Sequence, residues 1–104
     1  MSEIVIDGRK IGPEHPPYMV AELSANHNGK LQKALDTITK AKACGADAVK
    51  LQTYTADTMT IDSDHEDFCI QGGLWDGYKL YDLYKEAETP FEWHKIMFGQ
   101  ARKI

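Results

Sequence analysis

The sequence predicts an α/β fold built around a parallel strand–helix–strand unit. Two short apolar runs, residues 18–22 and 48–54, are typical of strands, and a helical stripe of apolar residues lies between them. Because parallel strands need a crossover of this kind, we expect the two runs to pair in parallel. The 104 residues are 42% hydrophobic and 27% charged, which indicates a folded domain rather than intrinsic disorder.

A β-hairpin is expected first, within residues 1–12. Two strand-like runs, residues 4–6 and 9–11, flank the dipeptide Asp7-Gly8, which is a strong signal for a two-residue hairpin turn. After a proline-containing loop comes the first strand of the central unit, residues 18–22. This run is short and apolar, so we expect it to be buried.

The helix of the central unit should begin near Leu31 and end before Gly45, which is a typical C-terminal stop. Cys44, at the end of its apolar stripe, is expected to be buried. The stripe itself repeats at helical spacing and consists of Leu31, Ala34, Leu35, Ile38 and Ala41.

Residues 55–75 show neither helical nor strand periodicity. A stretch of this length often marks a functional loop or lid, and the alternative is a disordered insertion. Two helices are expected after it. The first carries an apolar stripe over residues 80–87, and the second should start with Thr89 as N-cap, Pro90 at the first helical position and Glu92 completing a capping box.

Composition narrows the classes of partner. Twelve basic against sixteen acidic residues give a formal net charge of −4, so nucleic acid is not an expected partner. No apolar run approaches the ~20 residues that span a bilayer, and the N-terminus lacks a signal-peptide pattern, so we expect a cytoplasmic protein without a membrane partner. Two cysteines are too few for a disulfide scaffold and lack metal-ligand spacing.

The second strand of the central unit places Lys50 and Gln52 on one face, opposite Val49 and Leu51. A lysine within a buried strand needs an anion, either a ligand phosphate or a protein carboxylate. Glu22 ends the first strand, so Glu22 and Lys50 should meet near the carboxyl ends of neighbouring strands, where α/β folds bind substrates. Such a pair suits an anionic substrate and acid–base chemistry.

The loop after Glu22 carries Asn26, His27, Asn28 and Gly29, just before a helix N-terminus that favours anions. The alternatives are that Asn28 is the helix N-cap and that His27 only orients other groups. The remaining histidines form no metal-ligand pair, and His94 is expected to face solvent.

Two motifs then become recognisable. Residues 20–29, VAELSANHNG, and residues 45–53, GADAVKLQT, resemble the N-terminal part of the sialic acid synthases and their relatives, the phosphoenolpyruvate-dependent nonulosonate synthases. The stretches 53–60, 75–77 and 89–94 look most like the pseudaminic acid synthase branch of that family. The resemblance covers nearly the whole chain from Ile4 onward.

This resemblance implies a (β/α)8 TIM barrel, with residues 1–104 as the N-terminal portion of the barrel domain and 1–12 as a preceding hairpin. The rest of the barrel and a C-terminal antifreeze-like domain, which caps the partner's active site in a homodimer, would lie outside this chain. The implied reaction condenses phosphoenolpyruvate with 2,4-diacetamido-2,4,6-trideoxy-L-altrose to give pseudaminic acid and phosphate. A divalent metal, Mn²⁺ or Mg²⁺, would polarise the sugar aldehyde.

By the same resemblance, Lys50 binds phosphoenolpyruvate with Gln52 beside it, Glu22 is the catalytic glutamate, and Asn26 and His27 shape the substrate site. The metal ligands have no counterpart in this chain, which is expected to be inactive alone. A sialic or legionaminic acid synthase, with another sugar, is the nearest alternative. A small non-catalytic module that binds an anion or a protein partner is the alternative from a different class.

Overall fold

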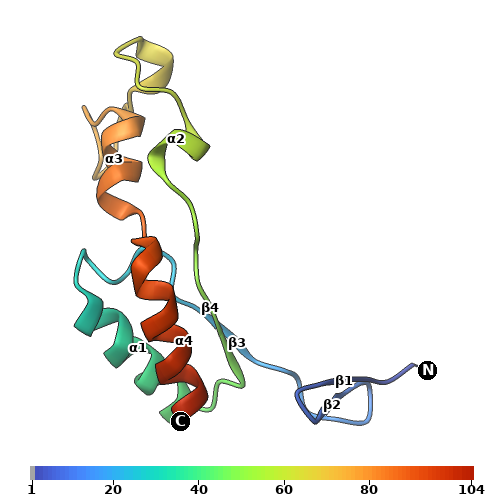
Figure 1. The fold of residues 1–104 in the computed structure, drawn as a ribbon. Helices are drawn as coiled ribbons and strands as arrows, with labels where there is room; N and C mark the ends of the chain where they lie inside the picture. The colour runs from blue at the N-terminus through green and yellow to red at the C-terminus, as the bar shows by residue number, and fades with distance from the viewer. Residues whose placement is uncertain (1) are drawn as a thin grey trace.

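The computed structural model describes residues 2–104 as an elongated molecule measuring 51 × 33 × 23 Å (Figure 1). A hairpin lies at one end, a strand–helix–strand unit in the middle, and a group of short helices at the other end. The elements, in chain order, are β1 (Ile4–Ile6), β2 (Arg9–Ile11), β3 (Val20–Glu22), α1 (Leu31–Ala43), β4 (Ala48–Lys50), α2 (Ala56–Met59), the 3-10 helix η1 (Glu66–Phe68), α3 (Leu80–Ala87) and α4 (Phe91–Lys103).

The predicted hairpin is confirmed. β1 and β2 pair antiparallel, with Ile4 opposite Ile11. Asp7 and Gly8 both have positive φ, 48° and 79°, as a two-residue turn that follows the strand twist requires. An ion pair ties the hairpin to the central unit, because Arg9 Nε lies 3.3 Å from Asp47 Oδ1.

The parallel strand–helix–strand unit is also confirmed. β3 pairs parallel with β4, and α1 connects them. Gly45, with φ 98°, ends α1 in a Schellman motif in which its N–H donates to Lys42 O and that of Ala46 to Ala41 O. Cys44 is exposed, so the prediction that it is buried is wrong.

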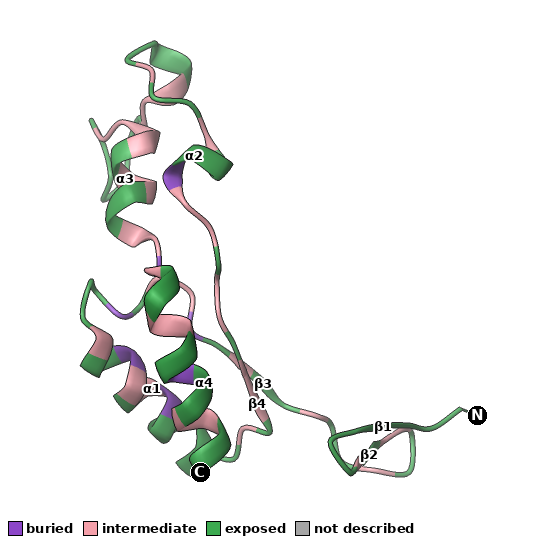
Figure 2. Cartoon of the chain, viewed as in Figure 1, coloured by how far each residue is buried: buried purple, intermediate pink, exposed green. Residues whose placement is uncertain are grey.

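The core lies on one side of the two-stranded sheet, between α1 and α4 (Figure 2). Ile38 of α1 and Met97 of α4 are its largest fully buried side chains, and Val49 and Leu51 pack against it. The other side of the sheet is open, and Val20 is 53% exposed. The prediction that the first strand is buried is therefore wrong, because helices cover only one face.

The segment between β4 and α3 has more local structure than its sequence indicates. Thr55 and Thr58 form a capping box around the single turn of α2. The predicted helix over residues 80–87 is confirmed as α3, whereas α4 begins at Phe91 with Pro90 as N-cap. No helix within residues 2–104 is long and apolar enough to cross a membrane.

Candidate active site

The structure brings together Glu22, Lys50 and Gln52, which the sequence predicts to share one face, although β4 ends at Lys50 and Gln52 lies just beyond it. Glu22 and Lys50 are register partners at the carboxyl ends of β3 and β4. Lys50 Nζ lies 3.7 Å from Glu22 Oε1, and Gln52 Nε2 donates a hydrogen bond of 3.4 Å to the same oxygen. The predicted alternation is confirmed, because Val49 and Leu51 pack on the helix side. We call Glu22, Lys50 and Gln52 the charged edge.

The charged edge is open to solvent, since the side chains of Lys50 and Glu22 are 63% and 46% exposed. An ion pair this exposed stabilises a fold by about 0–1 kcal/mol. The pair therefore contributes little to folding of the described residues. The Lys50 ammonium and the Glu22 carboxylate are instead accessible to a ligand that has an anionic group and a proton to transfer.

His27 occupies a different environment from the charged edge. Its ring is buried, and it packs edge-on against Trp93 with the ring centroids 5.2 Å apart. Nδ1 accepts a hydrogen bond from Gly29 N–H, so Nε2 carries the proton and donates to Thr89 Oγ1 at 3.0 Å. Burial lowers the pKa of His27 and favours this neutral ring.

His27 thus joins the loop after β3 to the residues just before α4. The sequence predicts Thr89 as the N-cap of the helix that follows, and this is wrong: Pro90 is the N-cap of α4, and the Thr89 hydroxyl instead faces His27. Asn26, in the same loop, is exposed and lines a separate cavity. Asn28 is not the N-cap of α1, because that position is held by Lys30.

A second link between a strand end and α4 was missed in the sequence. His94 does not face solvent as predicted, because it is half-buried and its Nε2 lies 2.6 Å from Thr53 Oγ1. His94 Nδ1 lies 3.2 Å from Phe91 O, which indicates that Nδ1 carries the proton and that Thr53 donates to Nε2. No local pattern signals this pairing, since the two residues are 41 positions apart.

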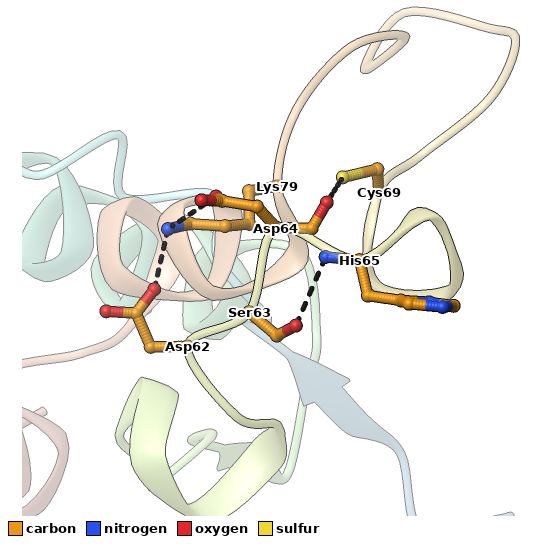
Figure 3. Close-up of polar contacts among 6 residues, drawn as sticks. All are labelled: Asp62, Ser63, Asp64, His65, Cys69 and Lys79. Atoms are coloured by element: carbon orange, nitrogen blue, oxygen red, sulfur yellow. Dashed lines mark hydrogen bonds and ion pairs between the residues drawn. The ribbon is translucent and has the colours of Figure 1, made fainter.

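The segment 55–79 follows the carboxyl end of β4 and is held by polar contacts (Figure 3). Lys79 Nζ lies 2.6 Å from Asp62 Oδ1 and 3.4 Å from Asp64 Oδ1. The hydrogen bond to Asp62 raises the pKa of Lys79 above its ordinary value. An isolated bridge pairs Cys69 with Lys79 and closes the segment's base.

Among the side chains of residues 2–104, no group of three or more His, Cys, Asp or Glu residues is arranged to hold a metal ion. The described residues alone do not form the divalent-metal site that the family resemblance implies.

Comparisons with known proteins agree with the fold and the motifs. Residues 37–104 match the NeuB family. The chain is 58% identical over 85 residues to the pseudaminic acid synthase of Campylobacter jejuni serotype O:2, covering 82% of the chain and 25% of that protein. It is 54% identical over 89 residues to the pseudaminic acid synthase of Helicobacter pylori, covering 86% of the chain and 26% of that protein.

A solved structure, the N-acetylneuraminic acid (sialic acid) synthetase of Leptospira borgpetersenii, superposes with a TM-score of 0.74 at 25% identity, covering 98% of this chain and 31% of that one. The hairpin and the parallel βαβ unit, superposed on this structure, form the N-terminal part of a (β/α)8 TIM barrel. The chain belongs to the NeuB family. It spans about a quarter of the length of the two pseudaminic acid synthases.

Proposed function

We propose that the chain supplies the first part of a pseudaminic acid synthase active site. The reaction would join phosphoenolpyruvate to 2,4-diacetamido-2,4,6-trideoxy-L-altrose and release phosphate. The observation that carries this proposal is the charged edge, with Lys50 Nζ 3.7 Å from Glu22 Oε1 at the carboxyl ends of parallel strands. The sugar is chosen because identity to the pseudaminic acid synthases is 54–58% over 82–86% of the chain, against 34% over 84% of the chain to the N,N'-diacetyllegionaminic acid synthase of Legionella pneumophila.

Each residue of the charged edge has a chemical role in the proposal. The Lys50 ammonium attracts the anionic phosphoenolpyruvate and holds it beside the carbonyl carbon of the sugar. Carbon 3 of phosphoenolpyruvate attacks that carbon, water adds at carbon 2, and phosphate leaves as the C–O bond breaks. The Glu22 carboxylate orients the water and accepts its proton, while Gln52 keeps Glu22 Oε1 in place through the 3.4 Å hydrogen bond.

The loop after β3 supports this site from outside the reacting centre. His27 is buried with both ring nitrogens hydrogen-bonded, so we assign it a positioning role rather than contact with substrate. Asn26 is exposed and remains a proposed substrate-binding residue. Dependence on Mn²⁺ or Mg²⁺, a homodimeric assembly, a cytoplasmic location and lack of activity of the chain alone are proposed on the family resemblance only.

The test is steady-state kinetics of the Lys50→Ala variant in the full-length protein. Loss of one charge-assisted contact of about 1.5–3 kcal/mol should raise the KM for phosphoenolpyruvate roughly 10- to 150-fold. Lys33→Ala, on the exposed surface of α1, is the matched control and should leave it unchanged. An unaltered KM in Lys50→Ala would remove Lys50 from the anion site.

The choice of sugar is tested in the same assay. Phosphate release should be fastest with the altrose derivative and slow with N-acetylmannosamine or the legionaminic acid precursor. Faster release with either of the other sugars would assign the chain to a different synthase of the family.

A further inference from the structure

A cavity separate from the charged edge lies between the loop after β3 and α3. Its volume is about 590 Å³, within the range of small-molecule sites. The residues that matter for its chemistry are Ser24, Asn26, Asn28, Trp75, Leu83 and Glu86. They come from loop 24–29, from the segment after β4 and from α3, so their elements follow the carboxyl ends of the two strands.

The cavity is close to the charged edge. Ser24 is only two residues beyond Glu22, so their Cα atoms are at most about 7 Å apart. The N–H of Asn26 donates to Leu23 O in a tight turn, which keeps Asn26 near the strand end as well. Ser24 and Asn28 both hold positive φ, 48° and 51°, a conformation that non-glycine residues rarely adopt and that often accompanies a functional site.

Trp75 is presented to the cavity by a well-bonded loop. Gly72 N–H donates to Asp76 Oδ1 at 2.6 Å, and Gly77 N–H donates to Ile70 O. The indole stands edge-on to Tyr78, with ring centroids 5.6 Å apart, and is still 47% exposed. A large aromatic ring on a well-bonded loop, with about half of its surface uncovered, is suited to stacking on a ligand.

The chemistry of the lining residues also indicates which class of ligand the cavity fits. Two amides, a hydroxyl and the Glu86 carboxylate offer hydrogen bonds to hydroxyl and amide groups, while Trp75 and Leu83 offer apolar surface. No lysine or arginine belongs to the described lining of this cavity, and the carboxylate would repel a phosphate. These groups favour a neutral, polyhydroxylated ligand with amide substituents over an anion.

We propose that this cavity binds the acetamido-bearing end of the sugar, with Trp75 stacking on it and Glu86 accepting a hydrogen bond from an amide or hydroxyl group. The inference rests on the proposed function, and it adds where the sugar lies. The aldehyde end reaches Glu22 at the charged edge, while the far end lies against Trp75. Trp75 is then a specificity-determining residue for the sugar and has no part in binding phosphoenolpyruvate.

The experiment compares Trp75→Leu, Glu86→Gln and wild type in the full-length protein. Each variant should raise the KM for the altrose sugar about tenfold and leave the KM for phosphoenolpyruvate unchanged. Phe98→Leu, which removes a similarly exposed aromatic ring from α4, is the control and should change neither value. An unchanged KM for the sugar in Trp75→Leu would overturn the inference while leaving the proposed function intact.

A binding measurement separates the two hypotheses if turnover fails. Saturation-transfer NMR with the altrose sugar alone should show transfer to the acetamido methyl protons in wild type and a clear loss in Trp75→Leu. If no sugar supports phosphate release but this Trp75-dependent transfer is seen, the proposed function is wrong and the cavity still binds the sugar. Equal transfer in both proteins would refute the cavity assignment.

Discussion

The hydrogen bond between His27 and Thr89 can be tested with a single change, Thr89→Val. Valine has almost the same shape as threonine, so it removes the hydroxyl and leaves the packing in place. Both side chains are 4% exposed, so water cannot replace the lost partner. In the variant, the Nε2 proton of His27 loses its hydroxyl acceptor and has only the Ala87 carbonyl nearby, while Gly29 N–H still binds Nδ1.

The expected loss of stability follows from this geometry. A buried donor left wholly unsatisfied costs about 1–3 kcal/mol, which is the upper bound here because the Ala87 carbonyl remains. The extra methyl group of valine offsets this by at most about 0.8 kcal/mol. The net change in the free energy of unfolding should therefore be a loss of roughly 0.2–2 kcal/mol.

The assay is urea unfolding of the 104-residue chain, followed by far-UV circular dichroism. Thr37→Val is the matched control, because the Thr37 hydroxyl bonds only Lys33 O within α1 and its loss should cost under about 0.5 kcal/mol. In a His27→Leu background, Thr89→Val should hardly change the free energy of unfolding, because the imidazole N–H that donates to the Thr89 hydroxyl is absent. Equal losses for Thr89→Val and Thr37→Val would refute the assignment of a buried hydrogen bond.

Three other predictions concern the same fold. Burial lowers the pKa of His27, so the folded protein favours the neutral ring. The contribution of this ring to the free energy of unfolding is therefore complete above the unfolded pKa of about 6.5. It falls as the pH drops from there toward the lower pKa of the folded state. The melting temperature should thus decrease between pH 7.5 and 5, less so in His27→Gln, and an equal decrease in both proteins would contradict this cause. Gly45→Ala should lower the free energy of unfolding, measured with urea, by about 1–2 kcal/mol, because alanine adopts the φ of 98° at this position only with strain. No atom lies within 4 Å of the added Cβ, so the loss comes from the backbone and not from crowding. Gly99→Ala, in the interior of α4 with open space around it, should instead stabilise by about 0.5–1 kcal/mol, and a loss of stability in both variants would argue against a backbone origin.

The features that the sequence predicted correctly depend on neighbouring residues or on strand periodicity. Asp7-Gly8 determines the hairpin because its turn geometry is local. Glu22 and Lys50 could be brought together because parallel pairing aligns the carboxyl ends of two strands joined by one helix. Only the alternation of side chains was then needed to place Gln52 on the same face as Lys50.

The features that the sequence did not predict depend on distant partners. Thr89 has the pattern of an N-cap, and its local sequence cannot reveal that a buried imidazole 62 positions away binds its hydroxyl. The burial of residues 18–22 was overestimated for a related reason. An apolar strand sequence indicates that a strand can be buried, but what covers it is decided by other elements, and here α1 and α4 cover one face only.

The two unpredicted hydrogen bonds both end at the N-terminal end of α4, and together they affect the geometry of the charged edge. His27, in the loop after β3, binds Thr89 just before α4, and Thr53, after β4, binds His94 in the first turn of α4. The N-terminal end of α4 therefore holds the chain beyond both strands whose ends carry Glu22 and Lys50. Since Gln52 is next to Thr53, a shift of this helix end would move the Gln52 amide that lies 3.4 Å from Glu22 Oε1. The geometry of the charged edge thus depends on a helix that contributes no side chain to it.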